Sequence, residues 1–185
     1  MAKQVDKYWT AASHGSKHQD IALRDLLHND FGLPQDKVEL CTLLTNFKKK
    51  KIIKLGKKDW ERLCPTNGVT DINELDLTPL AIIFRSIEHI VPNFSDHMRK
   101  VKQEYEPFVK QACSNRNDLA HPRKDQMTKN KFIEIMKKIT STLLGMNYSQ
   151  MKIFEYWKTC PIYDENLKQE LHSMIDKLFQ GKSTQ

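Results

Sequence analysis

Turn-forming residues are scarce in this chain of 185 residues, which contains only 6 glycines and 7 prolines. A β-sandwich or β-barrel needs a turn after every short strand, so this composition disfavours both and favours helices. Long apolar runs are missing as well. The longest, residues 80–84, is far shorter than the roughly 20 residues that cross a bilayer as a helix. We therefore expect an all-α protein with no membrane-spanning segment.

Metal-binding and secretory signals are also lacking. The four cysteines lie far apart, with no CxxC pair and no histidine at ligand spacing, which argues against structural zinc. The N-terminal stretch is polar through Arg24 and has no apolar core of a signal peptide. We expect free thiols, no metal or other cofactor, and an intracellular, most specifically cytoplasmic, location.

Positive charge is concentrated in one segment. The chain carries 30 basic and 23 acidic residues, a net charge of +7, and residues 48–62 hold eight of the basic and two of the acidic ones. One interpretation is that this segment follows an RNA backbone. The other is a solvated helix end, where cations are favourable. The candidate RNA-binding residues here are Lys48, Lys49, Lys50 and Lys51.

Apolar spacing predicts about six or seven helices in a single domain over residues 19–180, with a flexible lead over 1–18 and a disordered tail over 181–185. The clearest helix has apolar residues in steps of three and four. Pro107 should kink or split this helix, and Pro122 should end it at His121. The apolar stripe consists of Phe94, Met98, Val101, Tyr105, Phe108 and Ala112.

Four residues beyond Ala112, the same stripe reaches Arg116. A buried arginine without a partner is costly, so we expect Arg116 to have an ion partner, a subunit partner or a ligand. His121 lies five residues further on, about 140° around an ideal helix. Pro122 disfavours helical geometry at His121, which lets the imidazole turn back toward Arg116. Asn117 precedes His121 by four residues and shares its face.

The string Arg-Asn-Asp-Leu-Ala-His at residues 116–121 resembles the RxxxxH motif of the HEPN superfamily. The wider pattern is similar to the HEPN subgroup named for the DAZ-interacting zinc-finger ubiquitin ligase (DZIP-type). This similarity covers roughly residues 20–180. The supporting stretches are Leu-Pro at 33–34, Lys-Asp-Trp at 58–60, Leu-Cys-Pro at 63–65, Asp-Leu-Thr-Pro-Leu at 76–80 and Trp-Lys-Thr-Cys at 157–160.

The resemblance implies a HEPN-like helical bundle that forms a homodimer through its motif-bearing helices. It also implies a metal-independent endoribonuclease that leaves 2′,3′-cyclic phosphate ends. His121 would then move a proton at the ribose 2′-hydroxyl or the leaving 5′-oxygen, and Arg116 would hold the scissile phosphate. Asn117 would orient His121 or the phosphate. Arg123 and Lys124 adjoin the motif and are further candidates for phosphate binding.

A second interpretation needs no catalysis. Arg116 is then a salt-bridged arginine, and His121 is a helix-capping histidine favoured by the helix dipole. The chain would be a non-catalytic module for RNA binding, dimerisation or docking of a protein partner, within a larger multidomain regulatory protein. Both interpretations are open at the level of the sequence.

Overall fold

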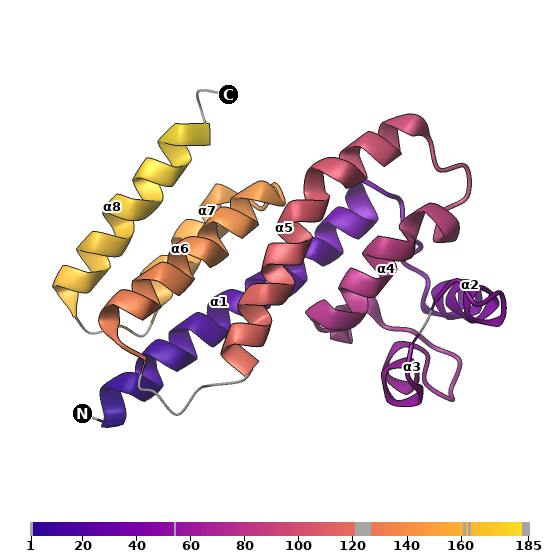
Figure 1. Cartoon of the computed structure of the whole chain (residues 1–185), viewed down its shortest axis with the longest axis horizontal. Coiled ribbons are helices and arrows are strands. Elements are labelled where there is room, and N and C mark those ends of the chain that lie inside the picture. The colour runs from indigo at the N-terminus through magenta and orange to yellow at the C-terminus, as the bar shows by residue number, and fades with distance from the viewer. Residues whose placement is uncertain (1, 54, 121–126, 161, 163, 183–185) are drawn as a thin grey trace. The chain divides into compact units, whose positions relative to one another are not determined.

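The computed structural model describes residues 2–53, 55–120, 127–160, 162 and 164–182, and these residues form helices and loops without a strand. This confirms the all-α class. The elements are drawn in Figure 1. They are α1 (Ala2–Asn29), α2 (Lys37–Lys49), α3 (Lys57–Leu63), the 3-10 helix η1 (Ile72–Glu74), α4 (Leu77–Ile90), α5 (Asp96–Ala120), α6 (Lys129–Gly145), α7 (Gln150–Thr159) and α8 (Glu165–Lys182).

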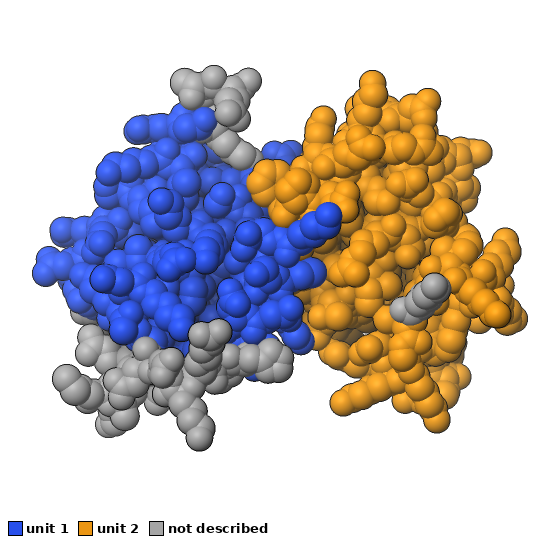
Figure 2. Space-filling view, viewed as in Figure 1, with its two compact units in different colours: residues 1–19, 110–185 blue, residues 20–109 orange. Residues whose placement is uncertain are grey.

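The chain divides into two compact units, coloured separately in Figure 2. Unit 1 contains residues 1–19 and 110–185, and unit 2 contains residues 20–109. Two helices are shared: α1 contributes residues 2–19 to unit 1, and α5 contributes residues 110–120. The motif region up to Ala120 therefore belongs to unit 1, whereas the lysine-rich segment belongs to unit 2.

Unit 2 has an aliphatic core with a small aromatic group. The ring of Phe31 contacts Phe84 edge-on at 6.0 Å between centroids and stacks on Phe94 at 5.9 Å. Arg24 ties α1 to the segment around η1, because its guanidinium donates to the carbonyl oxygens of Ile72 and Leu75. The fully buried leucines include Leu23, Leu27, Leu40, Leu44, Leu63, Leu77 and Leu80.

Unit 1 is built around α6, which packs against both α7 and α8 (Figure 1). The apolar face of α6 is fully buried at Phe132, Met136 and Ile139. Thr128 caps this helix as its sequence position predicts, since its hydroxyl accepts from the backbone N–H of Lys131. Tyr8 of α1 stacks on Phe132 with ring centroids 4.8 Å apart.

The predicted flexible lead over residues 1–18 is replaced by helix. Helix α1 begins at Ala2, and from Tyr8 onward it buries Tyr8, Ala11 and Ala12. Gly15, which lies in this stretch, has a packing role. A Cβ at Gly15 would lie 2.7 Å from the hydroxyl oxygen of Tyr156, whose hydroxyl donates to the carbonyl of Ala11. Small residues here let α7 approach α1.

Helix α5 runs without interruption from Asp96 to Ala120 and contains Pro107. Pro107 was expected to kink or split this helix, and the split is absent although a proline removes one helical hydrogen bond. At the opposite end of the chain, α8 begins directly after Asp164, whose carboxylate accepts from the N–H of Leu167. Among the residues that the structure describes, no helix is both long enough and apolar enough to cross a membrane.

Candidate nucleic-acid site at the end of helix α5

The last turn of α5 carries the first half of the RxxxxH string. Arg116 is half-buried there, and Asn117 and Asp118 are exposed. The helix ends at Ala120. His121, Arg123 and Lys124 lie outside the residues that the structure describes, so their predicted roles stay predictions.

The buried face of α5 runs through Val109, Ala112 and Asn115. In the last turn the buried position is therefore Asn115, one residue before the Arg116 that the apolar stripe indicated. Arg116 lies on the flank of this face, where a long side chain can bury its stem and keep its charged end near solvent. Asn115 occupies the core position and is only 2% exposed.

Asn115 is the centre of a buried hydrogen-bond network that joins three helices of unit 1. Its amide nitrogen donates to Gln19 Oε1 at 2.9 Å and to Thr142 Oγ1 at 3.3 Å. Its amide oxygen accepts from Gln111 Nε2 at 2.9 Å. The Thr142 hydroxyl in turn donates to the carbonyl of Lys138 at 2.7 Å. The network fixes the end of α5 against α1 and α6.

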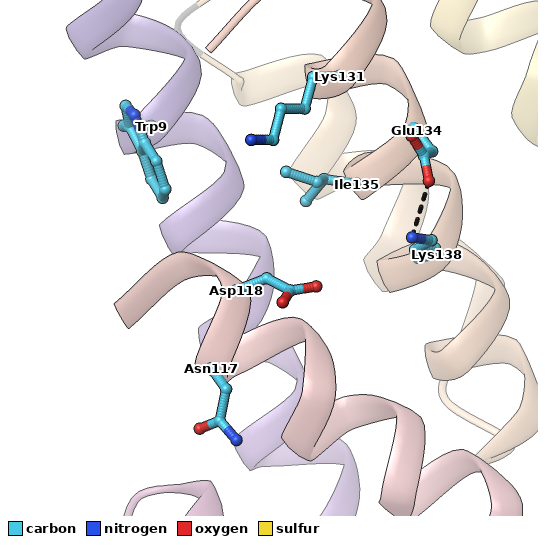
Figure 3. A pocket seen from close by; sticks show the side chains of 7 residues that line it. All are labelled: Trp9, Asn117, Asp118, Lys131, Glu134, Ile135 and Lys138. Carbon is cyan, nitrogen blue, oxygen red and sulfur yellow. Dashed lines mark ion pairs between the residues drawn. The ribbon is translucent and has the colours of Figure 1, made fainter. Parts of the chain in front are cut away.

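A hollow of about 480 Å³ lies beside this turn, between α1, α5 and α6 of unit 1. Figure 3 shows Trp9 projecting from α1, Asp118 from α5, and the ammonium of Lys131 reaching toward the space between Trp9 and Ile135. The remaining lining residues are Asn117, Glu134 and Lys138.

The charges around the hollow are balanced. Lys138 and Glu134 form an ion pair at 2.8 Å, drawn as a dashed line in Figure 3. This hydrogen bond lowers the pKa of Glu134 and raises the pKa of Lys138, and the charge of Asp118 raises the latter further. With Lys131 and Asp118, the lining holds two cations and two anions. Such a lining suits a polar but uncharged group better than a row of phosphates.

The four candidate lysines of unit 2 are all exposed, as RNA-binding residues must be. Two of them have aromatic neighbours, one distant in the sequence and one three residues away. Lys48 Nζ lies 4.1 Å from the centroid of the Trp60 ring, and Lys50 Nζ lies 5.8 Å from that of Phe47. Each of these two lysines therefore has a local aromatic partner, and RNA binding by this segment stays a prediction.

No group of three or more histidine, cysteine, aspartate or glutamate side chains could hold a metal ion within the described ranges. The described part of the last turn of α5 offers a half-buried guanidinium and an exposed amide beside the hollow. The string in the sequence adds an imidazole at the position after Ala120.

The described residues form an all-α fold, and the match to a family model over most of the chain places the protein among the HEPN domains. More narrowly, the chain belongs to the DZIP3/hRUL138-like HEPN family, whose model matches residues 24–170. A search of curated proteins gave no significant match. A search of solved structures gave none either.

Sequence reasoning missed Trp9 and Asn115 as parts of this region. Trp9 fell in the supposed flexible lead, because the buried positions around it are mostly small residues that give a weak apolar pattern. Asn115 left no signal in an apolar pattern, because its burial depends on partners that only the tertiary structure supplies.

Proposed function

We propose that this HEPN domain is an RNA-directed, metal-independent endoribonuclease with Arg116 and His121 as its catalytic residues. The observation that carries the proposal is the position of Arg116. It lies half-buried in the last turn of α5, next to the fixed Asn115 and five residues before His121. Membership of the HEPN family supports the same conclusion.

The chemistry would be an internal transesterification. A base removes the proton of the ribose 2′-hydroxyl, and the 2′-oxygen attacks the adjacent phosphorus. The bond from phosphorus to the 5′-oxygen breaks, and an acid protonates that oxygen, which leaves a 2′,3′-cyclic phosphate and a 5′-hydroxyl. Imidazole suits both proton transfers because it titrates near neutral pH. A guanidinium at Arg116 would stabilise the extra negative charge on the phosphorane oxygens.

A homodimer fits this proposal, because the motif histidine of one chain supplies only one of the two proton-transfer groups. Two chains that meet through the ends of their α5 helices would bring together two copies of Arg116 and His121. Asn117, exposed in the same turn, would then contact the phosphate or the partner chain.

The test is cleavage of a labelled mixed-sequence RNA in the presence of EDTA. We expect the wild type to cleave and to leave cyclic-phosphate ends. His121→Ala should lower the rate by about 10²–10⁴-fold, the usual contribution of general acid–base catalysis. Arg116→Ala should cost about 10²–10³-fold, as for the loss of one stabilising donor. His97→Ala is the matched control, since His97 is an exposed histidine in the first turn of α5.

If wild type and all variants leave RNA intact while Arg116→Ala or His121→Ala abolishes dimerisation in light scattering, the motif belongs to an interaction surface. The module would then serve to bind another protein chain, and the catalytic proposal would be wrong.

A further inference from the structure

We infer that the hollow between α1, α5 and α6 is a binding site for one unpaired nucleobase, which stacks on the indole of Trp9. The inference rests on the proposed function in one respect only, that the natural ligand is RNA. It adds a site that the RxxxxH motif does not include.

The first argument is the state of the three tryptophans. Trp157 is buried in the core of unit 1, at 2% exposure. Trp60 in unit 2 has the ammonium of Lys48 over its ring. Trp9 is half-buried and lines a hollow instead. An aromatic ring that lines an accessible hollow is the feature with which proteins hold single-stranded bases, because every base has a π-face.

The second argument is the shape and polarity of the hollow. Its volume of about 480 Å³ lies within the range of small-molecule sites. Ile135, which is buried, provides an apolar wall opposite Trp9, and Lys131 reaches toward the space between them (Figure 3). A base entering this space would stack on one wall, contact the other, and accept a hydrogen bond from Lys131. The carboxylate of Asp118, which also lines the hollow, is placed to accept from an amino group of the base.

The third argument is the charge balance. Phosphate groups are attracted by excess positive charge. In this lining Glu134 neutralises Lys138 in an ion pair, and the charge of Asp118 offsets that of Lys131. A nucleobase is neutral and carries donors and acceptors, so it matches the lining better than the phosphate does. The hollow adjoins the turn that holds Arg116, so a base bound here would belong to a nucleotide near the scissile phosphate.

The experiment is a titration of the full chain with guanosine and adenosine 5′-monophosphates, followed by tryptophan fluorescence. Ribose 5-phosphate is the control ligand without a base. We expect both nucleotides to quench the fluorescence and ribose 5-phosphate to leave it unchanged. Trp9→Phe should remove most of the quenching but keep an aromatic surface. Trp9→Ala should weaken binding by about 5- to 150-fold, the loss of one stacked base.

Matched variants separate this site from the general charge of the surface. Lys131→Ala should weaken nucleotide binding, whereas Lys129→Ala should not, because Lys129 pairs with Glu170 of α8. Trp60→Phe should also leave binding unchanged. Equal binding of ribose 5-phosphate and the nucleotides, or wild-type affinity in Trp9→Ala with its helical spectrum intact, would overturn the inference.

This outcome is distinguishable from failure of the proposed function. Nucleotide binding requires neither cleavage nor His121, so His121→Ala should bind the monophosphates as the wild type does. If the chain binds nucleotides through Trp9 but does not cleave RNA, the base-site inference stands and the nuclease proposal is wrong. If the chain binds no monophosphate, and the Trp9→Ala variant cleaves RNA as well as the wild type, the nuclease proposal stands and the base-site inference is wrong.

Discussion

Replacing Asn115 by alanine should destabilise the protein by about 2–4 kcal/mol. The amide of Asn115 donates to Gln19 and Thr142 and accepts from Gln111. Gln111 is exposed and can bond to water after the change, so its loss costs little. Gln19 is fully buried, and its Oε1 loses the donor that Asn115 supplies. A buried acceptor left without a partner costs about 1–3 kcal/mol, and each lost net hydrogen bond costs about 1 kcal/mol.

The measurement is urea-induced unfolding followed by circular dichroism. Ser114→Ala is the matched control, because Ser114 is the exposed residue immediately before Asn115. A surface change of this kind is usually worth less than about 0.5 kcal/mol. The slope of the unfolding free energy against urea should stay the same in both variants, so that the shift in midpoint reports stability alone.

A double-mutant cycle then tests the specific bond between Asn115 and Gln19. Residues that share a buried hydrogen bond couple by about 0.5–3 kcal/mol. The double alanine variant should therefore be less destabilised than the sum of the two single variants. Additive losses, or an Asn115→Ala variant as stable as Ser114→Ala, would show that the network does not hold these helices.

Two further predictions concern other parts of unit 1. Gly15→Ala should destabilise the protein by about 1–3 kcal/mol, as overpacking does, because its Cβ would press on the Tyr156 hydroxyl; Gly181→Ala, whose Cβ meets nothing within 4 Å, should be neutral or slightly stabilising in the same urea titration. Burial, and to a smaller extent the charges of His14 and Lys152, lower the pKa of His18 below 6.5. As the pH falls, His18 is therefore protonated in the unfolded chain before it is protonated in the folded one. The free energy of unfolding should fall as the pH drops below about 6.5 toward the lowered pKa. His18→Gln should reduce this slope, whereas a slope that His18→Gln leaves unchanged would contradict the assignment.

The helical class could be predicted because the apolar residues of α4, α5, α6 and α8 recur in steps of three and four. These steps follow directly from helix geometry, and they need no information about partners. The starts of α6 and α8 were predictable for a similar reason, since Thr128 and Asp164 are side chains that cap the N–H groups of the next turn.

The first half of α1 shows where such reasoning fails. Its buried positions from Tyr8 to Ser16 are filled largely by alanine, glycine and serine, which carry little weight in an apolar pattern. Gly15 is small because the Tyr156 hydroxyl lies against it, and a sequence pattern does not show what lies on the other side of a helix. The same limitation hid Trp9, the aromatic residue of the proposed base site.

The candidate site stays a prediction, and the sequence pointed to it only through its charged residues. Arg116 was noticed because a charge on an apolar stripe is conspicuous, yet the core position is Asn115. A leucine at 115 would bury more apolar surface and would need no partners. An asparagine there accepts and donates at fixed angles, so it favours one register of α5 against Gln19 and Thr142. Catalytic groups must be held to within about half an ångström. Asn115 buries less apolar surface than a leucine would, but it fixes the position of the neighbouring Arg116. A catalytic arginine would require such a fixed position.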